Sequence, residues 1–102
     1  MNVICFGDSN TYGYDPRSYF GGRYPKDSRW VDLLAEKTGW QITNLGENGR
    51  CVPAAAAGLP ANTDLCIVML GTNDLLQGST PEQTSQRMRR FLQGLSVAPQ
   101  KV

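Results

Sequence analysis

Three short polar turns carry the residues whose types could do chemistry together. The turns are Gly7-Asp8-Ser9-Asn10, Asn48-Gly49 and Gly71-Thr72-Asn73-Asp74. The Ser9 hydroxyl is a candidate nucleophile, and the Gly49 N–H and the Asn73 side-chain amide are candidate hydrogen-bond donors. Donors of this kind stabilise the negative charge that builds on a carbonyl oxygen during acyl transfer. The three turns therefore point to chemistry on an ester or a related acyl compound.

The chain contains no histidine, which limits that chemistry. A serine hydroxyl is a weak nucleophile unless an adjacent base takes its proton. The cysteines Cys5, Cys51 and Cys66 have no CxxC spacing, so without histidine we expect no metal site, and no motif calls for a cofactor. Cys5 and Cys66 lie in apolar runs and are expected to be small buried hydrophobic residues.

Composition argues against several classes of function. The 102 residues suffice for one small domain, 40% of them are hydrophobic, and the formal net charge is +1. This balance leaves no basic surface for nucleic acid or an anionic membrane, so we expect neither as a partner. We also expect no signal peptide and no membrane-spanning segment. An odd number of cysteines without a disulfide pattern is typical of a reducing compartment, which predicts a cytoplasmic location.

Apolar patterning predicts strands that alternate with helices. Strands are expected at residues 2–6, 40–44 and 65–70, helices at 28–37, 51–58 and 81–95, a loop at 14–25, and the start of a further strand at 101–102. We expect the last helix to begin with a capping box formed by Thr80 and Gln83. Its apolar stripe includes Phe91, Leu92 and Leu95. Since the run from Leu65 to Leu70 is apolar on both faces, the order predicts an α/β fold with a parallel sheet between helices.

The predicted sheet gives the three turns a common location. Each turn follows one of the predicted strands. In parallel sheets, sites collect at the carboxyl ends of the strands. We therefore expect Ser9, Gly49 and Asn73 at one rim of the sheet.

The three turns resemble the sequence blocks of a known family. The segments FGDSNTYG, NLGENGR and LGTND are similar to the first three blocks of the SGNH hydrolases, the GDSL-type esterases and lipases. The resemblance implies a flavodoxin-like, three-layer parallel sheet with strand order 2-1-3. It also implies a small-molecule ester substrate, with Ser9 as the nucleophile and with the Ser9 N–H, Gly49 N–H and Asn73 amide as oxyanion donors. Gly46 is an alternative match for the second glycine.

Other residues near these blocks are secondary candidates. Asp8 is expected to accept backbone hydrogen bonds that hold its turn. Asn10, which stands where the best-known form of the family has leucine, is a candidate for substrate binding, as are Arg50 and Asp74. Four further residues either line a pocket or belong to a surface loop: Arg17, Tyr19, Phe20 and Arg23.

The last block of the family, which supplies an aspartate and a histidine, has no match in this chain. We therefore interpret residues 1–102 as one partial SGNH-hydrolase domain, truncated after about three strands and inactive on esters by itself. The run from Leu65 to Leu70 would then form an open edge, which predicts self-association. A partner chain that supplies the missing strands and the histidine is the alternative.

Two other functions remain open at this point. A non-catalytic module on the same fold could hold a carboxylate or an acetyl group with the same donors. A flavodoxin-like binder of a small molecule such as a nucleotide is disfavoured, because the chain has neither GxGxxG nor GK[ST].

Overall fold

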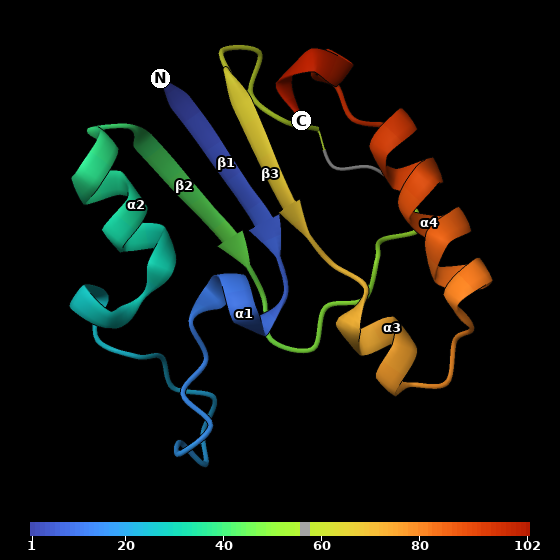
Figure 1. The fold of residues 1–102 in the computed structure, drawn as a ribbon, viewed down its shortest axis with the longest axis horizontal. Helices are drawn as coiled ribbons and strands as arrows, with labels where there is room; N and C mark the ends of the chain where they lie inside the picture. The colour runs from blue at the N-terminus through green and yellow to red at the C-terminus, as the bar shows by residue number, and fades with distance from the viewer. Residues whose placement is uncertain (56–57) are drawn as a thin grey trace.

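A parallel three-stranded sheet forms the centre of the protein in a computed structural model that describes residues 1–55 and 58–102 (Figure 1). The strands are β1 (Asn2–Gly7), β2 (Gln41–Gly46) and β3 (Leu65–Met69), in the order β2-β1-β3. Phe6 of β1 lies opposite Leu45 of β2 and Val68 of β3. The predicted parallel sheet and its 2-1-3 order are confirmed.

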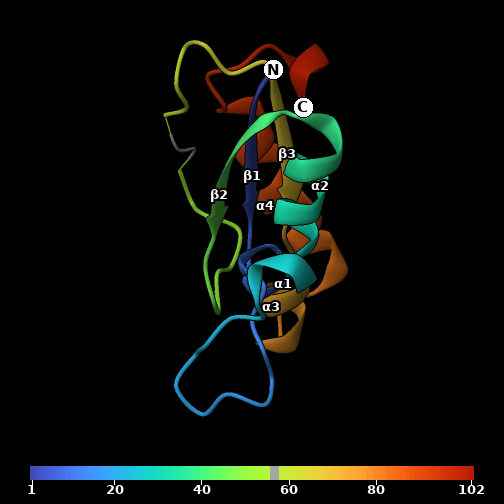
Figure 2. The ribbon, with the colours of Figure 1, turned by 90° about the vertical axis from the view of Figure 1, so that its left-hand side faces the viewer.

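Helices cover both faces of this sheet. They are α1 (Ser9–Tyr12), α2 (Trp30–Thr38), α3 (Thr72–Leu76) and α4 (Pro81–Gln93), with short 3₁₀ turns η1 (Lys26–Ser28) and η2 (Pro99–Lys101). Because side chains alternate along a strand, β1 contributes to two cores. Val3 and Cys5 pack with Val31 of α2, whereas Ile4 and Phe6 pack with Phe91 of α4. The result is three layers, with α2 and α4 on opposite faces (Figure 2).

The start of α4 follows the sequence prediction closely. The Thr80 hydroxyl accepts the N–H of Gln83, and the Gln83 side chain accepts the N–H of Thr80. Phe91 is buried against Phe6, with ring centroids 5.1 Å apart, while Leu92 is 38% exposed. Leu95 is buried but lies beyond the end of the helix. In the described part of the chain, no helix is both long and apolar enough to cross a membrane.

Two predicted elements are wrong. Residues 51–55 of the predicted helix at 51–58 are not helical, and residues 56–57 lie outside the described residues. Pro53 explains the difference, because it disfavours helical conformation in the residue before it; the N–H of that residue, Val52, bonds to the side chain of Asp74. The predicted strand start at residues 101–102 is instead the end of η2, which begins with Pro99.

Candidate active site

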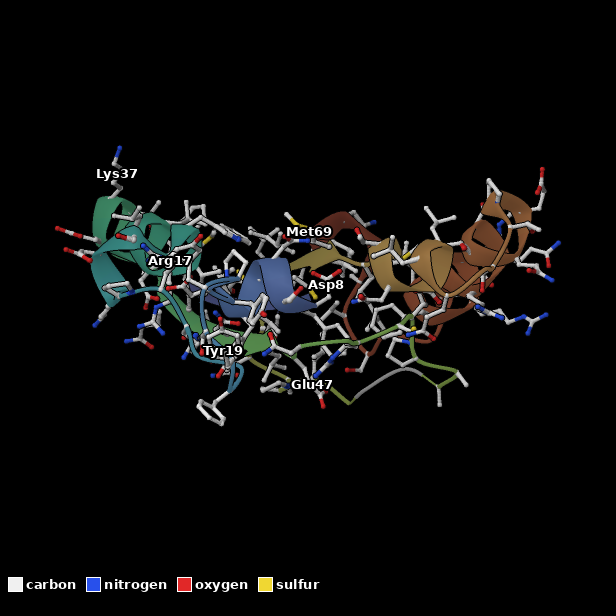
Figure 3. All side chains as sticks on the ribbon, turned by 90° about the horizontal axis from the view of Figure 1, so that it is seen from below. Asp8, Arg17, Tyr19, Lys37, Glu47 and Met69 are labelled. Carbon is white, nitrogen blue, oxygen red and sulfur yellow. The ribbon has the colours of Figure 1, made fainter. Side chains whose placement is uncertain are left out.

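The three polar turns meet at one rim of the sheet, as the parallel topology requires. Asp8 follows β1, Glu47 follows β2, and Met69 is the last residue of β3. The view of the carboxyl ends of the strands places these three labelled residues in the middle of the molecule (Figure 3). The backbone joins two of the turns directly, since the Glu47 N–H donates to the Gly7 carbonyl at 3.2 Å.

The first turn presents Ser9 at the start of a helix. Asp8 is buried and caps α1, because its Oδ1 accepts the N–H of Asn10 at 2.9 Å. This confirms the hydrogen bond expected of Asp8. Gly7 lets α1 pack tightly on the end of β1, since a Cβ there would collide with the Thr11 hydroxyl and lie 2.8 Å from the Met69 carbonyl oxygen. Ser9 is half-buried, whereas Asn10 is exposed.

The two glycines that are alternative matches for the second block lie at the end of β2 and in the turn that follows it: Gly46 is the last residue of β2, and Gly49 belongs to the second turn. Gly49 has a φ of +77°, and a Cβ added there would meet none of the described residues within 4 Å, so glycine serves the left-handed turn. A Cβ on Gly46 would collide with the backbone of Tyr12, so glycine there serves the packing of α1 on β2. The two glycines therefore do different work, and the exposed turn position belongs to Gly49.

The third turn is bonded to the second. Asn73, in the first turn of α3, donates one Nδ2–H to the carbonyl oxygen of Arg50 at 3.0 Å. A primary amide carries two N–H groups. One of them fixes the orientation of the side chain, which leaves the other for a ligand.

A cavity of about 290 Å³ joins the first two turns. Its lining consists of Ser9, Tyr14, Ser18, Tyr19, Gly21, Asn48 and Gly49. Within the described residues, neither the Ser9 N–H nor the Gly49 N–H donates to another protein group. Asn73 does not line this cavity. It is bonded to Arg50, the residue that follows Gly49 of the lining. A second cavity of about 220 Å³ also reaches Ser9 and includes Asn10, Tyr14 and Trp30.

The loop between α1 and η1 forms one wall of the cavity. An isolated bridge pairs Tyr14 with Arg23, and the Ser18 hydroxyl accepts the N–H groups of Phe20 and Gly22. Tyr19 is 97% exposed and lines the cavity, whereas the side chain of Phe20 is 99% exposed and does not. The sequence is compatible with either a pocket wall or a surface loop here. Tyr19 is both exposed and part of the cavity lining.

Two arginines of the loop have partners within the chain. The Arg17 guanidinium pairs with Asp15 at 2.9 Å and lowers the pKa of that carboxyl, mainly through the side-chain hydrogen bond. Arg23 donates to the Tyr12 carbonyl at 2.7 Å and lies over the Tyr12 ring at 4.4 Å. Neither arginine lines the cavity around Ser9 and Gly49, so both hold the loop rather than the rim.

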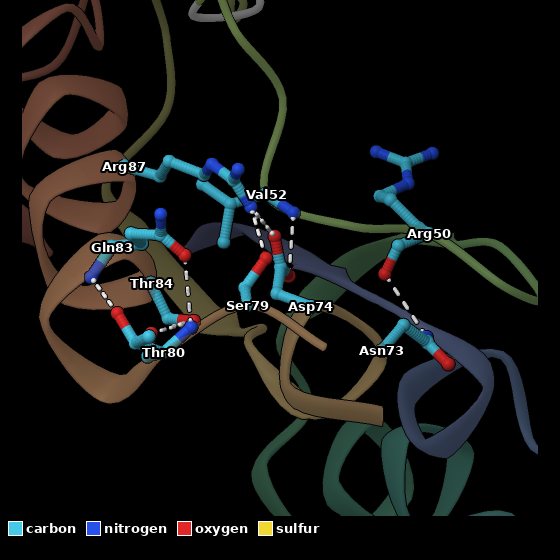
Figure 4. Close-up of polar contacts among 9 residues, drawn as sticks. All are labelled: Arg50, Val52, Asn73, Asp74, Ser79, Thr80, Gln83, Thr84 and Arg87. Carbon is cyan, nitrogen blue, oxygen red and sulfur yellow. Dashed lines mark hydrogen bonds and ion pairs between the residues drawn. The ribbon is translucent and has the colours of Figure 1, made fainter. Parts of the chain in front are cut away.

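Asp74 and Arg50 have partners other than the substrate that the sequence suggested for them. The Asp74 side chain is 0% exposed, its Oδ1 accepts the Val52 N–H at 3.0 Å, and its Oδ2 lies 3.4 Å from Arg87 Nη1 (Figure 4). The Arg50 guanidinium lies 4.2 Å above the Phe6 ring and pairs with Glu47 at 2.8 Å. Both oxygens of the Asp74 carboxylate are therefore engaged within the protein in this structure, and the Arg50 guanidinium is held by Glu47 and Phe6.

Sequence reasoning did not single out four residues that line the cavity. They are Tyr14, Ser18, Gly21 and Asn48. The sequence does offer a signal for Asn48, because this residue directly precedes Gly49. In the structure, Asn48 Nδ2 donates to the Gly21 carbonyl at 3.5 Å. Tyr14, Ser18 and Gly21 have no such signal in the sequence, since their position depends on how the loop folds back on α1.

The arrangement supplies a hydroxyl and donors but no imidazole. The chain has no histidine, and the described residues hold no group of three metal-ligating side chains. The buried thiols do not substitute as bases, because burial raises the pKa of Cys66 and raises that of Cys5 to about 11. The rim thus offers the Ser9 hydroxyl together with the N–H groups of Ser9 and Gly49, which have no acceptor among the described residues.

Comparison with known proteins supports the resemblance to the GDSL-type esterases and lipases. The profile of the GDSL-like Lipase/Acylhydrolase family matches residues 5–101. The chain is 31% identical to Thioesterase 1/protease 1/lysophospholipase L1 of Escherichia coli, over 94% of this chain and 46% of that protein. It is 36% identical to a Bacillus subtilis protein named as an uncharacterized lipoprotein, YqeF, over 89% of this chain and 40% of the other.

A solved structure shows the same fold. It is a carbohydrate acetylesterase family member from Sinorhizobium meliloti, with 26% identity and a TM-score of 0.73, and it matches 90% of this chain and 52% of its own. The chain thus spans about half the length of the relatives it matches. By its profile match over residues 5–101, this chain belongs to the GDSL-like lipase/acylhydrolase family.

Proposed function

We propose that the rim carries the nucleophile and the oxyanion donors of a serine esterase that acts on a small-molecule ester. Ser9 Oγ attacks the ester carbonyl carbon, and the carbonyl oxygen becomes an oxyanion. The Ser9 N–H, the Gly49 N–H and the second Asn73 amide N–H are its donors. The observation that carries the proposal is the cavity shared by Ser9 and Gly49, in which both backbone N–H groups lack an acceptor within the described residues.

We infer that the base lies outside these 102 residues. An attack by Ser9 requires a group that takes the hydroxyl proton and later returns a proton to the leaving alcohol. The sequence contains no histidine that could serve as this base. The base then comes from a further segment or from a partner chain, and residues 1–102 act as one partial domain that is nearly inactive by itself.

The test is the turnover of 4-nitrophenyl acetate by the purified chain and by Ser9→Ala. We expect the two chains to release 4-nitrophenolate at indistinguishable rates, because the hydroxyl has no base. A robust rate that disappears in Ser9→Ala would contradict the inferred lack of a base.

A carboxylate-binding module is the second candidate, and it is favoured by the same two N–H groups, which have no acceptor in the described part of the chain. Such a module would hold acetate or a similar anion without covalent chemistry. Titration with acetate, monitored by ¹⁵N–¹H spectra, tests it: the module predicts saturable shifts at Ser9 and Gly49. If these amides do not respond at any acetate concentration, the binding module is excluded.

We also propose that a second copy of the chain pairs with the free edge of β3. In the described residues, β3 pairs only with β1. Beside the free edge is an apolar cavity of about 420 Å³, lined by Leu65, Cys66, Ile67, Val68, Met88, Leu92 and Val102. An apolar edge is a template for strand pairing. Sedimentation velocity should show a concentration-dependent dimer or larger species; a monomer at every concentration contradicts this.

A cytoplasmic location is the remaining proposal, and the free thiols support it. Cys5, Cys51 and Cys66 are all unpaired, which is typical of a reducing compartment. Mass spectrometry of the chain, isolated from its source cells after thiol blocking, should show three blocked thiols. A disulfide to another molecule at Cys51, the most accessible of the three, would oppose the proposal.

A further inference from the structure

Two consecutive residues of α3 are bonded to the segment that follows Gly49. The Asn73 amide donates to the Arg50 carbonyl at 3.0 Å, and Asp74 Oδ1 accepts the Val52 N–H at 3.0 Å (Figure 4). The two bonds end at Arg50 and Val52, which are two residues apart in the sequence. Residues 50–52 are therefore attached to α3 at two points, one of them through a carboxylate.

Gly49 has few constraints of its own. A Cβ at this position would have no neighbour within 4 Å among the described residues, so no close packing at the Cβ position fixes the place of Gly49. Before Gly49, the Glu47 N–H is bonded to the end of β1 at 3.2 Å. Across the turn, the Arg50 N–H donates to the Glu47 carbonyl at 3.3 Å, and the two side chains pair at 2.8 Å. After Gly49, the Arg50 carbonyl and the Val52 N–H are bonded to α3. The position of Gly49 in the cavity wall thus depends on the hydrogen bonds made by the residues before and after it.

Asp74 is the buried charge in this arrangement. Its side chain is 0% exposed, and its second oxygen lies 3.4 Å from Arg87 Nη1 of α4. Arg87 also donates to the Ser79 hydroxyl at 2.7 Å, which orients the guanidinium. A buried carboxylate is costly unless it is paired and hydrogen-bonded, and a charged acceptor binds an N–H more strongly than a neutral one. The ion pair therefore ties α4 to the segment that follows Gly49.

We propose that Asp74 is a positioning residue for the Gly49 donor. Its carboxylate, held by Arg87, fixes the Val52 N–H and through it keeps Gly49 at the wall of the cavity that contains Ser9. Asp74 does not touch the substrate in this arrangement. The proposal rests on the oxyanion role of Gly49 proposed above, but its structural half can be tested without any activity.

The structural test compares ¹⁵N–¹H spectra and amide hydrogen exchange of the chain with those of Asp74→Ala and Asp74→Asn. In Asp74→Ala we expect shifted resonances for Gly49 and Val52, and exchange at Val52 that is faster by about tenfold or more. Amides of β1, such as those of Val3 and Cys5, should keep their protection. Asp74→Asn retains an acceptor for the Val52 N–H, so its Gly49 resonance should lie between those of the other two chains.

Asp64→Ala is the matched control. Asp64 also accepts a backbone N–H across the sheet, that of Asn2 at 2.7 Å, but at the amino-terminal end of β3. Its loss should leave the Gly49 resonance unchanged. If Asp74→Ala does not fold, Arg87→Gln takes its place: it alters a residue of α4 and should shift Val52 and Gly49 in the same direction as Asp74→Asn. Folded variants at both positions with unchanged Gly49 and Val52 signals would overturn the proposal.

A kinetic arm separates this proposal from the function on which it rests. With imidazole added as an external base, the maximal Ser9-dependent release of 4-nitrophenolate should fall in Asp74→Asn by about tenfold or more, with an unchanged KM. An unchanged maximal rate would overturn the catalytic half of the proposal. If the parent chain shows no Ser9-dependent rate, the proposed function fails, and the spectra still decide whether Asp74 positions Gly49.

Discussion

The side-chain amide of Asn73 is bonded to the carbonyl oxygen of Arg50 at 3.0 Å, so the turn after β3 is fastened to the residue that follows Gly49. This bond joins Asn73, one of the proposed oxyanion donors, to the residue that follows Gly49, a second proposed donor, across 23 residues of sequence. It also uses only one of the two N–H groups of the amide. Asn73 can therefore hold the rim together and still donate to a bound oxygen.

Replacement of Asn73 by alanine should affect stability and chemistry by different amounts. Loss of the bond to Arg50 should lower the free energy of unfolding by about 1 kcal/mol. Loss of an oxyanion donor should lower Ser9-dependent acylation, measured with added imidazole, by about 10²–10³-fold. Urea denaturation measures the first effect. A decrease in acylation no larger than the loss of folded chain would show that Asn73 is only structural.

Gly46 and Gly49 should respond differently to replacement by alanine. Gly46→Ala forces a methyl group into the backbone of Tyr12, which should cost about 1–3 kcal/mol or more. Gly49→Ala has open space but a left-handed φ of +77°, which should cost about 1–2 kcal/mol. With folded chain held equal, only Gly49→Ala should displace the Gly49 N–H and reduce acylation at Ser9. A purely structural effect at both positions would reopen the choice between them.

Most of the fold followed from the sequence, because the signals for it are local. Apolar runs gave the three strands, and the capping box at Thr80 and Gln83 gave the start of α4. The predicted helix after Cys51 was wrong for a local and a distant reason: Pro53 disfavours a helical conformation at Val52, and the Val52 N–H is bonded to Asp74, 22 residues away. The cavity wall at Tyr14 and Ser18 could not be predicted, since it depends on a loop that folds back through contacts between distant residues.

Truncation of Phe91 should destabilise the protein far more than truncation of its neighbour. Phe91 is buried against Phe6, so Phe91→Ala should cost about 3–5 kcal/mol. Leu92 is 38% exposed, so Leu92→Ala should cost much less. Thermal and urea unfolding of the two variants provide the comparison. Equal losses would mean that α4 does not pack as described.

Alkaline pH should destabilise the chain through Cys5. Burial, with a smaller effect from Cys66, raises the pKa of Cys5 from 9.0 to about 11. The folded state then keeps a proton that the unfolded state loses, so this contribution is complete below pH 9.0 and is lost as the pH rises to about 11. Unfolding midpoints across this range should fall more steeply for the parent chain than for Cys5→Ala. Parallel slopes would contradict the raised pKa.

The most direct test of the proposed site is to supply the missing base. Imidazole, titrated into the chain with 4-nitrophenyl acetate, can accept the Ser9 proton while 4-nitrophenolate leaves and an acetyl-Ser9 forms, which water then hydrolyses. Ser9→Ala, measured at each imidazole concentration, removes the hydrolysis that imidazole performs by itself. We predict an excess rate over Ser9→Ala that is absent without imidazole and grows with it, together with acetyl-Ser9 detected by mass spectrometry. Equal rates for the two chains at every imidazole concentration, with no acetyl group on Ser9, would contradict the assignment of Ser9 as the nucleophile.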